Sequence, residues 1–155
     1  MNLVGRGSPT EQPQRTSRYQ QKGTQVSDAL VAVLPPRASS ASAAREIVTG
    51  RCAAWGLESL CDDAALVVTE LVANAVRHAG TDIELRVQQI LGGLRLEVRD
   101  GSTRPLRPRP ALSSDEGGRG LMLVDALANR YGVAGEPEGK RVWVELVTAA
   151  VSSRP

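Results

Sequence analysis

Residues 83–98 alternate between apolar and polar side chains on either side of two consecutive glycines, Gly92 and Gly93. Side chains of a β-strand point alternately to its two faces, so each stretch is expected to form a strand with one apolar face. A glycine pair between two such strands is typical of a β-hairpin. The apolar positions are Ile83, Leu85, Val87, Leu94, Leu96 and Val98. A sheet with one apolar face needs a covering layer, and this requirement restricts the fold.

Segments with helical periodicity supply that layer. Apolar residues between 38 and 55 recur at steps of three and four, and residues 58–78 are apolar over most of a helical circumference. A third helix is expected over 121–128, and further strands over 29–34, 131–133 and 142–146. The order β, α, α, β, β, loop, α, β, β predicts an α+β two-layer sandwich, with about three helices on one face of a mixed, mostly antiparallel sheet.

The charge distribution separates an N-terminal arm from the rest of the chain. Residues 1–25 contain four cations and one anion and lack apolar periodicity, which indicates a disordered basic arm. The whole chain of 155 residues carries a net charge of +2, so the residues after 25 carry −1. We therefore expect a folded domain over 26–148 and a tail over 149–155. The folded part offers no excess of positive charge to a nucleic acid, and no direct nucleic-acid partner is expected.

Residue types also restrict location and metal chemistry. No apolar run reaches the roughly 20 residues that span a bilayer, and the N-terminus lacks the apolar stretch of a secretory signal. Two cysteines and one histidine cannot assemble a four-ligand zinc site or a disulfide framework. These observations predict a cytoplasmic protein with reduced thiols and no membrane contact.

Three separated pieces have polar residues or glycines at positions suited to chemistry. Glu70 and Asn74 are four residues apart on a predicted helix and share one side of it. Asp100 has the parity of the apolar residues in its strand, so its carboxylate is expected to point towards the core. Glycines at the start of the third helix, within 116–121, would let a phosphate approach unpaired N–H groups. Each piece also has a plain interpretation: a solvated helix face, a turn cap and a flexible hinge, respectively.

The order and spacing of these pieces resemble the GHKL superfamily, the ATP-binding fold of DNA gyrase, heat-shock chaperone ATPases and sensor histidine kinases. The closest likeness is to bacterial anti-sigma-factor serine/threonine kinases. Residues 70–79 resemble their N box, 98–100 the strand that enters the first glycine box, and 118–121 the second glycine box. The resemblance covers about residues 29–147 and implies the Bergerat ATP-binding fold.

The sequence also departs from the family pattern at three positions. Ser102 and Arg104 stand where the first glycine box usually has glycines. Arg141 stands where a threonine often helps to hold the adenine.

The resemblance implies a site for ATP and Mg²⁺ between the second helix and the 101–116 loop. Asp100 would accept the adenine amino group, Asn74 would be the protein ligand of Mg²⁺, and Glu70 would be the catalytic base. The backbone of the second glycine box would hold the phosphates, and arginines would meet their charge. The implied nucleotide-binding residues are Asn74, Arg77, His78, Asp100, Gly118, Arg119, Gly120 and Leu121, with Arg104, Arg107 and Arg109 as further cations. His78 lies near the apolar stripe of its helix, so a core histidine is the plain interpretation.

The implied function is that of an ATP-binding anti-sigma factor that phosphorylates a serine or threonine of an antagonist protein. Its partners would be that antagonist, a sigma factor or both, and a homodimer is expected. The alternative is a non-catalytic module that senses ATP or ADP and sequesters a regulatory partner. An arginine-rich nucleic-acid binder is a third class, which the charge of the folded part disfavours.

Overall fold

The computed structural model describes residues 29–102 and 116–149, with side chains from 122 onwards in the second range. The predicted arm (1–25), most of the 101–116 loop and all but the first residue of the tail lie outside the described residues. Eight elements follow one another in the predicted order. They are β1 (Leu30–Leu34), α1 (Ser39–Ala54), α2 (Glu58–Ala79), β2 (Ile83–Ile90), β3 (Gly93–Asp100), α3 (Glu116–Leu127), β4 (Arg130–Glu136) and β5 (Gly139–Val147).

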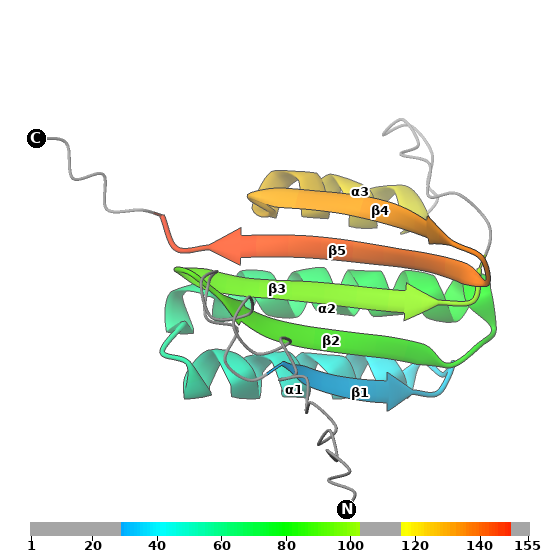
Figure 1. The fold of residues 1–155 in the computed structure, drawn as a ribbon, viewed down its shortest axis with the longest axis horizontal. Coiled ribbons are helices and arrows are strands. Elements are labelled where there is room, and N and C mark those ends of the chain that lie inside the picture. Colours follow the sequence, from blue (N-terminus) through cyan, green and yellow to red (C-terminus); the bar gives the residue numbers. More distant parts are fainter. Residues whose placement is uncertain (1–28, 103–115, 150–155) are drawn as a thin grey trace, which may run out of the picture.

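The strands form one sheet in the order β1-β2-β3-β5-β4. All four pairings between the described strands are antiparallel. The three helices cover one face of this sheet and leave the other face open (Figure 1). The predicted α+β two-layer sandwich is therefore confirmed.

The core lies between the sheet and α2, which contacts β2, β3, β5 and both other helices. The six apolar hairpin positions predicted to face inwards are at most 1% exposed. From the helix layer, Val67, Val68 and Val72 of α2, with Val48 of α1 and Val124 of α3, are fully buried. Burying one such side chain contributes about 1.5–3 kcal/mol, so this interface is the main source of stability. Among the described residues, no helix is long and apolar enough to cross a membrane.

Glycines end both long helices, as predicted. The helix α1 ends before Gly56, which has a φ of 67°, and α2 ends before Gly80, which has a φ of 62°. Glycine adopts this left-handed backbone without the steric cost that a Cβ imposes.

The hairpin turn is one residue earlier than the sequence suggested. Ile90 pairs with Gly93, so the two-residue turn is Leu91-Gly92, and Gly93 begins β3. A Cβ at Gly93 would lie 1.9 Å from the carbonyl oxygen of Leu146 on β5. Gly93 is therefore needed for close approach of β5, whereas Gly92, with a φ of 73°, serves the turn.

A glycine also fixes how closely β5 approaches the end of β3. A Cβ at Gly139 would lie 1.9 Å from the carbonyl oxygen of Asp100, whereas a Cβ at Gly135, in the paired strand β4, meets nothing within 4 Å. We expect Gly139→Ala to lower the free energy of unfolding by about 1–3 kcal/mol, because the strand must shift. Gly135→Ala is the matched control and should change it little. Urea denaturation measures both, and equal midpoints for the two variants would contradict this account.

Candidate functional site

The three predicted pieces of the site come together at one end of the sheet. The C-terminal end of α2, the end of β3 and the start of α3 all lie at the right-hand end of the molecule in Figure 1. A hydrogen bond joins the segment after α2 to the segment after β3, because the Gly101 N–H donates to Thr81 Oγ1 at 2.9 Å. A Cβ at Gly101 would lie 2.8 Å from the Thr81 side chain, so this approach also depends on glycine.

Asn74 is buried within α2, with 7% of its surface exposed. Arg77, one turn later, donates from Nη2 to Asn74 Oδ1 at 3.1 Å. An amide oxygen has two lone pairs, so Oδ1 retains capacity for a second partner. The structure thus places a cation on the oxygen that the sequence resemblance assigned to Mg²⁺.

Glu70 lies one turn before Asn74 on α2 and is half-buried. In the described part of the chain, its carboxylate has no hydrogen bond or ion pair. A carboxylate at the edge of a site, without a fixed partner, is free to accept a proton or bind a donor. The role of catalytic base for Glu70 stays a prediction.

The plain interpretation of His78 as a core histidine is wrong. Its side chain is exposed, as is that of Arg77. Ala75 is the last buried residue of α2. His78 therefore belongs to the final turn, beyond the residues that pack on the sheet.

Asp100 points inwards, as its parity predicted, and only 5% of its surface is exposed. Its Oδ1 accepts a hydrogen bond from the Ser102 N–H at 2.8 Å. Its Oδ2 lies 3.8 Å from Nζ of Lys140, which is directly opposite on β5. The carboxylate is therefore a turn cap through one oxygen, and the second oxygen faces a buried cation.

Lys140 is the residue of this site that the sequence prediction missed. The prediction aligned Arg141 with the threonine that helps to hold adenine, but Arg141 lies on the open face of the sheet. There it donates to Glu97 at 2.7 Å and to Glu136 at 3.0 Å. The buried residues Val142, Val144 and Leu146 share their parity with position 140, so alternation along β5 could have identified Lys140.

Ion pairs join three strands on the open face. Glu97 also accepts from Arg95, and Glu136 accepts from Arg99. Burial alone would raise the pKa of Glu97, but hydrogen bonds from Arg141 and Arg95 outweigh burial and hold the pKa below its ordinary value. Hydrogen bonds from Arg99 and Arg141 likewise lower the pKa of Glu136. These arginines are engaged within the sheet, away from the helix layer.

The second glycine box lies in the first turns of α3. The helix begins at Glu116, so Gly118, Arg119 and Gly120 are helical rather than part of a preceding turn. The side chains of Arg119 and Leu121 lie outside the described residues, as do Arg104, Arg107 and Arg109. The backbone N–H groups of a helical first turn have no partner within the helix, and they favour an anion.

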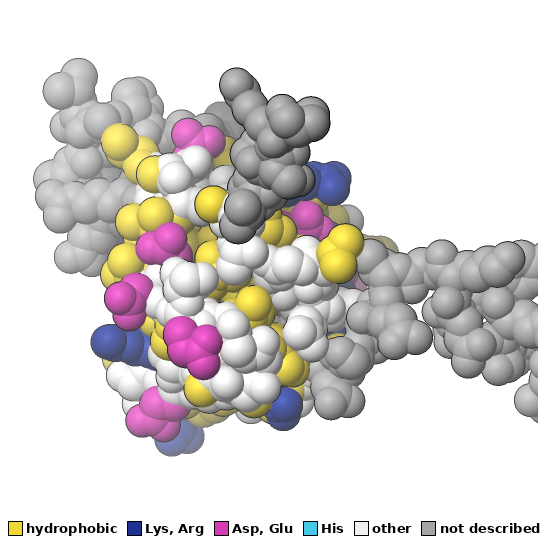
Figure 2. Space-filling model, turned by 90° about the vertical axis from the view of Figure 1, so that its left-hand side faces the viewer, with side chains coloured by type: hydrophobic (Ala, Val, Ile, Leu, Met, Phe, Trp, Pro, Cys, Tyr) yellow, Lys and Arg dark blue, Asp and Glu magenta, His cyan; other side chains and the backbone are white. Residues whose placement is uncertain are grey.

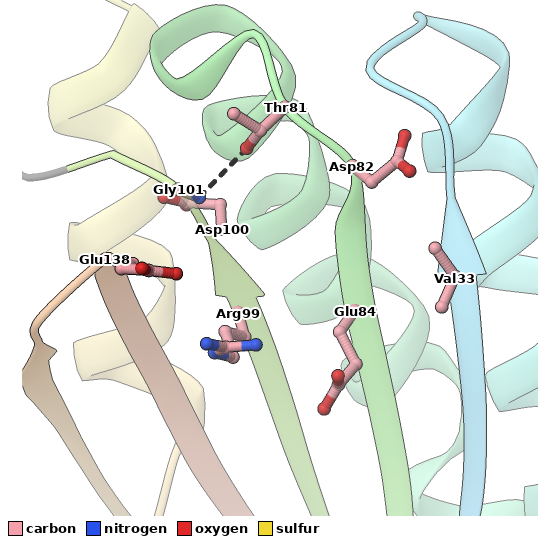
Figure 3. Close-up of a pocket in the computed structure, with 8 residues that line it drawn as sticks. All are labelled: Val33, Thr81, Asp82, Glu84, Arg99, Asp100, Gly101 and Glu138. Carbon is pink, nitrogen blue, oxygen red and sulfur yellow. Dashed lines mark hydrogen bonds between the residues drawn. The ribbon is translucent and has the colours of Figure 1, made fainter.

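A hollow of about 280 Å³ opens at the same end of the sheet. Figure 3 shows Val33, Glu84 and Arg99 from three adjacent strands below Thr81, Asp82 and Gly101. Asp100 and Glu138 also line it, and its acidic residues, which outnumber the single cation Arg99, would repel phosphate. No group of three or more His, Cys, Asp or Glu side chains in the described ranges could hold a metal ion. The hollow is therefore not the expected phosphate site, which would lie on the helix side.

The opposite end of the molecule differs from this one. Acidic and basic side chains are scattered there among hydrophobic and uncharged ones (Figure 2). The described part of that face shows no cluster of basic side chains that would suit phosphates.

Comparison with known proteins identifies a family and a relative. A family model described as histidine kinase-like ATPase domain matches residues 34–146. A protein of Streptomyces coelicolor described as uncharacterized is 39% identical over 79 residues, which are 48% of this chain and 73% of that protein. The family match spans every element from the end of β1 to β5, and it contains Glu70, Asn74, Asp100 and Lys140.

The open-face ion pairs predict a pH dependence of stability. The pKa of Glu97 is lower in the folded chain than its ordinary value of 4.5. The contribution of Glu97 to the free energy of unfolding is therefore fully present above about pH 4.5. It is lost as the pH falls through the pKa of Glu97 in the folded chain. We expect Glu97→Gln to lower stability at pH 7 by about 1 kcal/mol or less and to flatten the decline towards pH 3.

Urea denaturation at pH 7 and pH 3 measures this effect. Glu46→Gln, at an exposed position of α1, is the control and should retain the parent pH dependence. A Glu97→Gln profile parallel to that of the parent would contradict the assignment.

Proposed function

Because the chain belongs to the family of histidine kinase-like ATPase domains, we propose that it is an ATP-dependent anti-sigma factor that phosphorylates a serine or threonine of an antagonist protein. Family membership supports nucleotide binding in a regulatory protein. The kinase reaction and the partners are our proposal. The observation that supports it best is the placement of Glu70 and Asn74 on adjacent turns of α2, at the end of the sheet where Asp100 is buried.

Each part of the site has a distinct task in this proposal. Asp100 accepts the amino group of adenine through the oxygen that does not cap the turn. The first turn of α3 supplies N–H groups to the phosphates. Glu70 accepts the proton of the attacking hydroxyl group, and a carboxylate suffices because positioning and charge neutralisation lower most of the barrier in phosphoryl transfer.

The residues present fit a magnesium ion that arrives with the nucleotide. Asn74 offers one buried amide oxygen, and the described residues contain no cluster of acidic side chains that would hold the ion alone. Mg²⁺ commonly keeps water and phosphate oxygens as its other ligands. When bound, it would neutralise phosphate charge during transfer.

Arg77 has to adjust when such a cation binds. Its guanidinium donates to Asn74 Oδ1, and two cations beside one oxygen repel each other. The Arg77 side chain is exposed, so it can turn towards the phosphates without disturbing the core. Arg77 would then exchange an amide partner for an anionic one.

The proposed partners are an antagonist protein, a sigma factor or both, with the chain acting as a homodimer. The alternative proposal, a nucleotide-sensing module without catalysis, uses the same binding residues and differs only in the role of Glu70. Phosphotransfer therefore distinguishes the two.

Nucleotide binding should stabilise the folded chain through Asp100. At an ATP–Mg²⁺ concentration a hundred times the Kd, we expect a gain of about 2.7 kcal/mol, seen as a rise in Tm. Asp100→Asn should abolish that rise, because an amide can present a donor to the adenine amino group. Asp82→Asn, an exposed carboxylate at the same end, is the control and should preserve it. An undiminished rise in Asp100→Asn would remove Asp100 from the site.

Replacing Glu70 should separate chemistry from binding. In a single-turnover assay with a phosphorylatable antagonist, Glu70→Ala should slow transfer by about 10²–10⁴-fold while ATP affinity changes little. Asn74→Ala should lose Mg²⁺-dependent binding and transfer together. Asp62→Ala, exposed near the start of α2, is the control. Transfer at the parent rate by Glu70→Ala would exclude Glu70 as the base, and ATP binding by the parent without any transfer would favour the sensing module.

A further inference from the structure

Lys140 and Asp100 form a buried pair at the end of the sheet. They are direct partners in the antiparallel register of β3 and β5. Both side chains lie on the helix-covered face, with 7% of Lys140 and 5% of Asp100 exposed. The next residues of β3 and β5 on this face, Val98 and Val142, are apolar and buried. Lys140 and Asp100 are therefore a charged pair at the edge of an apolar core.

The pair has hydrogen-bonding capacity that the chain does not use. Nζ and Oδ2 are 3.8 Å apart, which is longer than an N–H···O hydrogen bond. In the described part of the chain, Nζ donates no hydrogen bond and Oδ2 accepts none, whereas Oδ1 is held by the Ser102 N–H. The ion pair therefore leaves donor capacity on Nζ beside acceptor capacity on Oδ2, which a ligand with a matching acceptor and donor could use.

The backbone holds the pair in place. Gly139 brings β5 so close to β3 that any larger residue would collide with the carbonyl oxygen of Asp100. The neighbouring Arg141 points to the other face and is held by Glu97 and Glu136. Lys140 is thus presented to Asp100 by the register of the strands, without competition from the adjacent cation.

We propose that Lys140 reads the nucleotide base together with Asp100, an inference that rests on the function proposed above. The outer edge of adenine presents an amino group that donates and the ring nitrogen N1 that accepts. Asp100 Oδ2 can only accept and Lys140 Nζ can only donate, so the pair matches that edge. Lys140 donates to N1 while Asp100 accepts from the amino group.

Lys140 thereby determines specificity through a single atom of the base, the ring nitrogen N1. A hydrogen bond from a charged donor in a buried site is stronger than a neutral one. Its loss should weaken binding by roughly 10- to 100-fold.

The test pairs an altered ligand with an altered residue. Affinity of the full chain is measured for ATP, for GTP and for the ATP analogue in which C–H replaces N1. The variants are Lys140→Met and, as a matched control on the open face, Arg141→Met. The parent and Arg141→Met should bind the analogue roughly 10- to 100-fold more weakly than ATP. Lys140→Met should bind both equally, because the contact is already absent.

Each outcome bears on a different claim. Equal binding of ATP and the analogue by the parent would overturn the role of Lys140, and this comparison needs no folded variant. The same preference in Lys140→Met as in the parent would overturn it too. GTP binding as tight as that of ATP would overturn the adenine assignment. Binding of none of the nucleotides would contradict the proposed function itself, and the inference with it.

Discussion

The burial of one face of the sheet beneath α2 determines where the candidate site residues of α2 and β3 lie. Because α2 packs along β2, β3 and β5, its last turns reach the end of the sheet at which β3 terminates. Asn74 on the helix and Asp100 on the strand are thereby held at the same end, and Thr81 fastens the two segments to each other through Gly101. The placement of Asn74 and Asp100 is thus a consequence of packing two regular elements against each other.

The same end of the molecule concentrates polar groups inside an otherwise apolar core. Asn74, Asp100 and Lys140 are all buried there, and burying charge without hydrogen bonds costs stability. On the open face, by contrast, Arg95 and Arg141 pair with Glu97, Glu136 and Glu145 at hydrogen-bonding distances. Charge on the open face stabilises the sheet, and the buried charge beneath the helices belongs to the nucleotide site that we propose.

The periodicity of apolar residues predicted the fold well, because an element that buries one face needs apolar residues at regular positions on that face. Alternation identified β2, β3 and the inward carboxylate of Asp100, and glycines marked the ends of α1 and α2. Contacts between strands were harder to predict from the sequence, because the pairing of Lys140 with Asp100 depends on the β3–β5 register. Local patterns also misplaced the hairpin turn by one residue and His78 on its helix. The contact between Arg77 and Asn74 depends on rotamers, which spacing alone does not determine.

The central claim is that a nucleotide binds between the end of α2, the end of β3 and the start of α3. Hydrogen–deuterium exchange with and without ATP–Mg²⁺ tests it most directly. We expect slower exchange in peptides covering 70–79, 98–102 and 116–121, with no change across α1. Unchanged exchange in those three segments, or protection confined to other parts of the chain, would contradict the account.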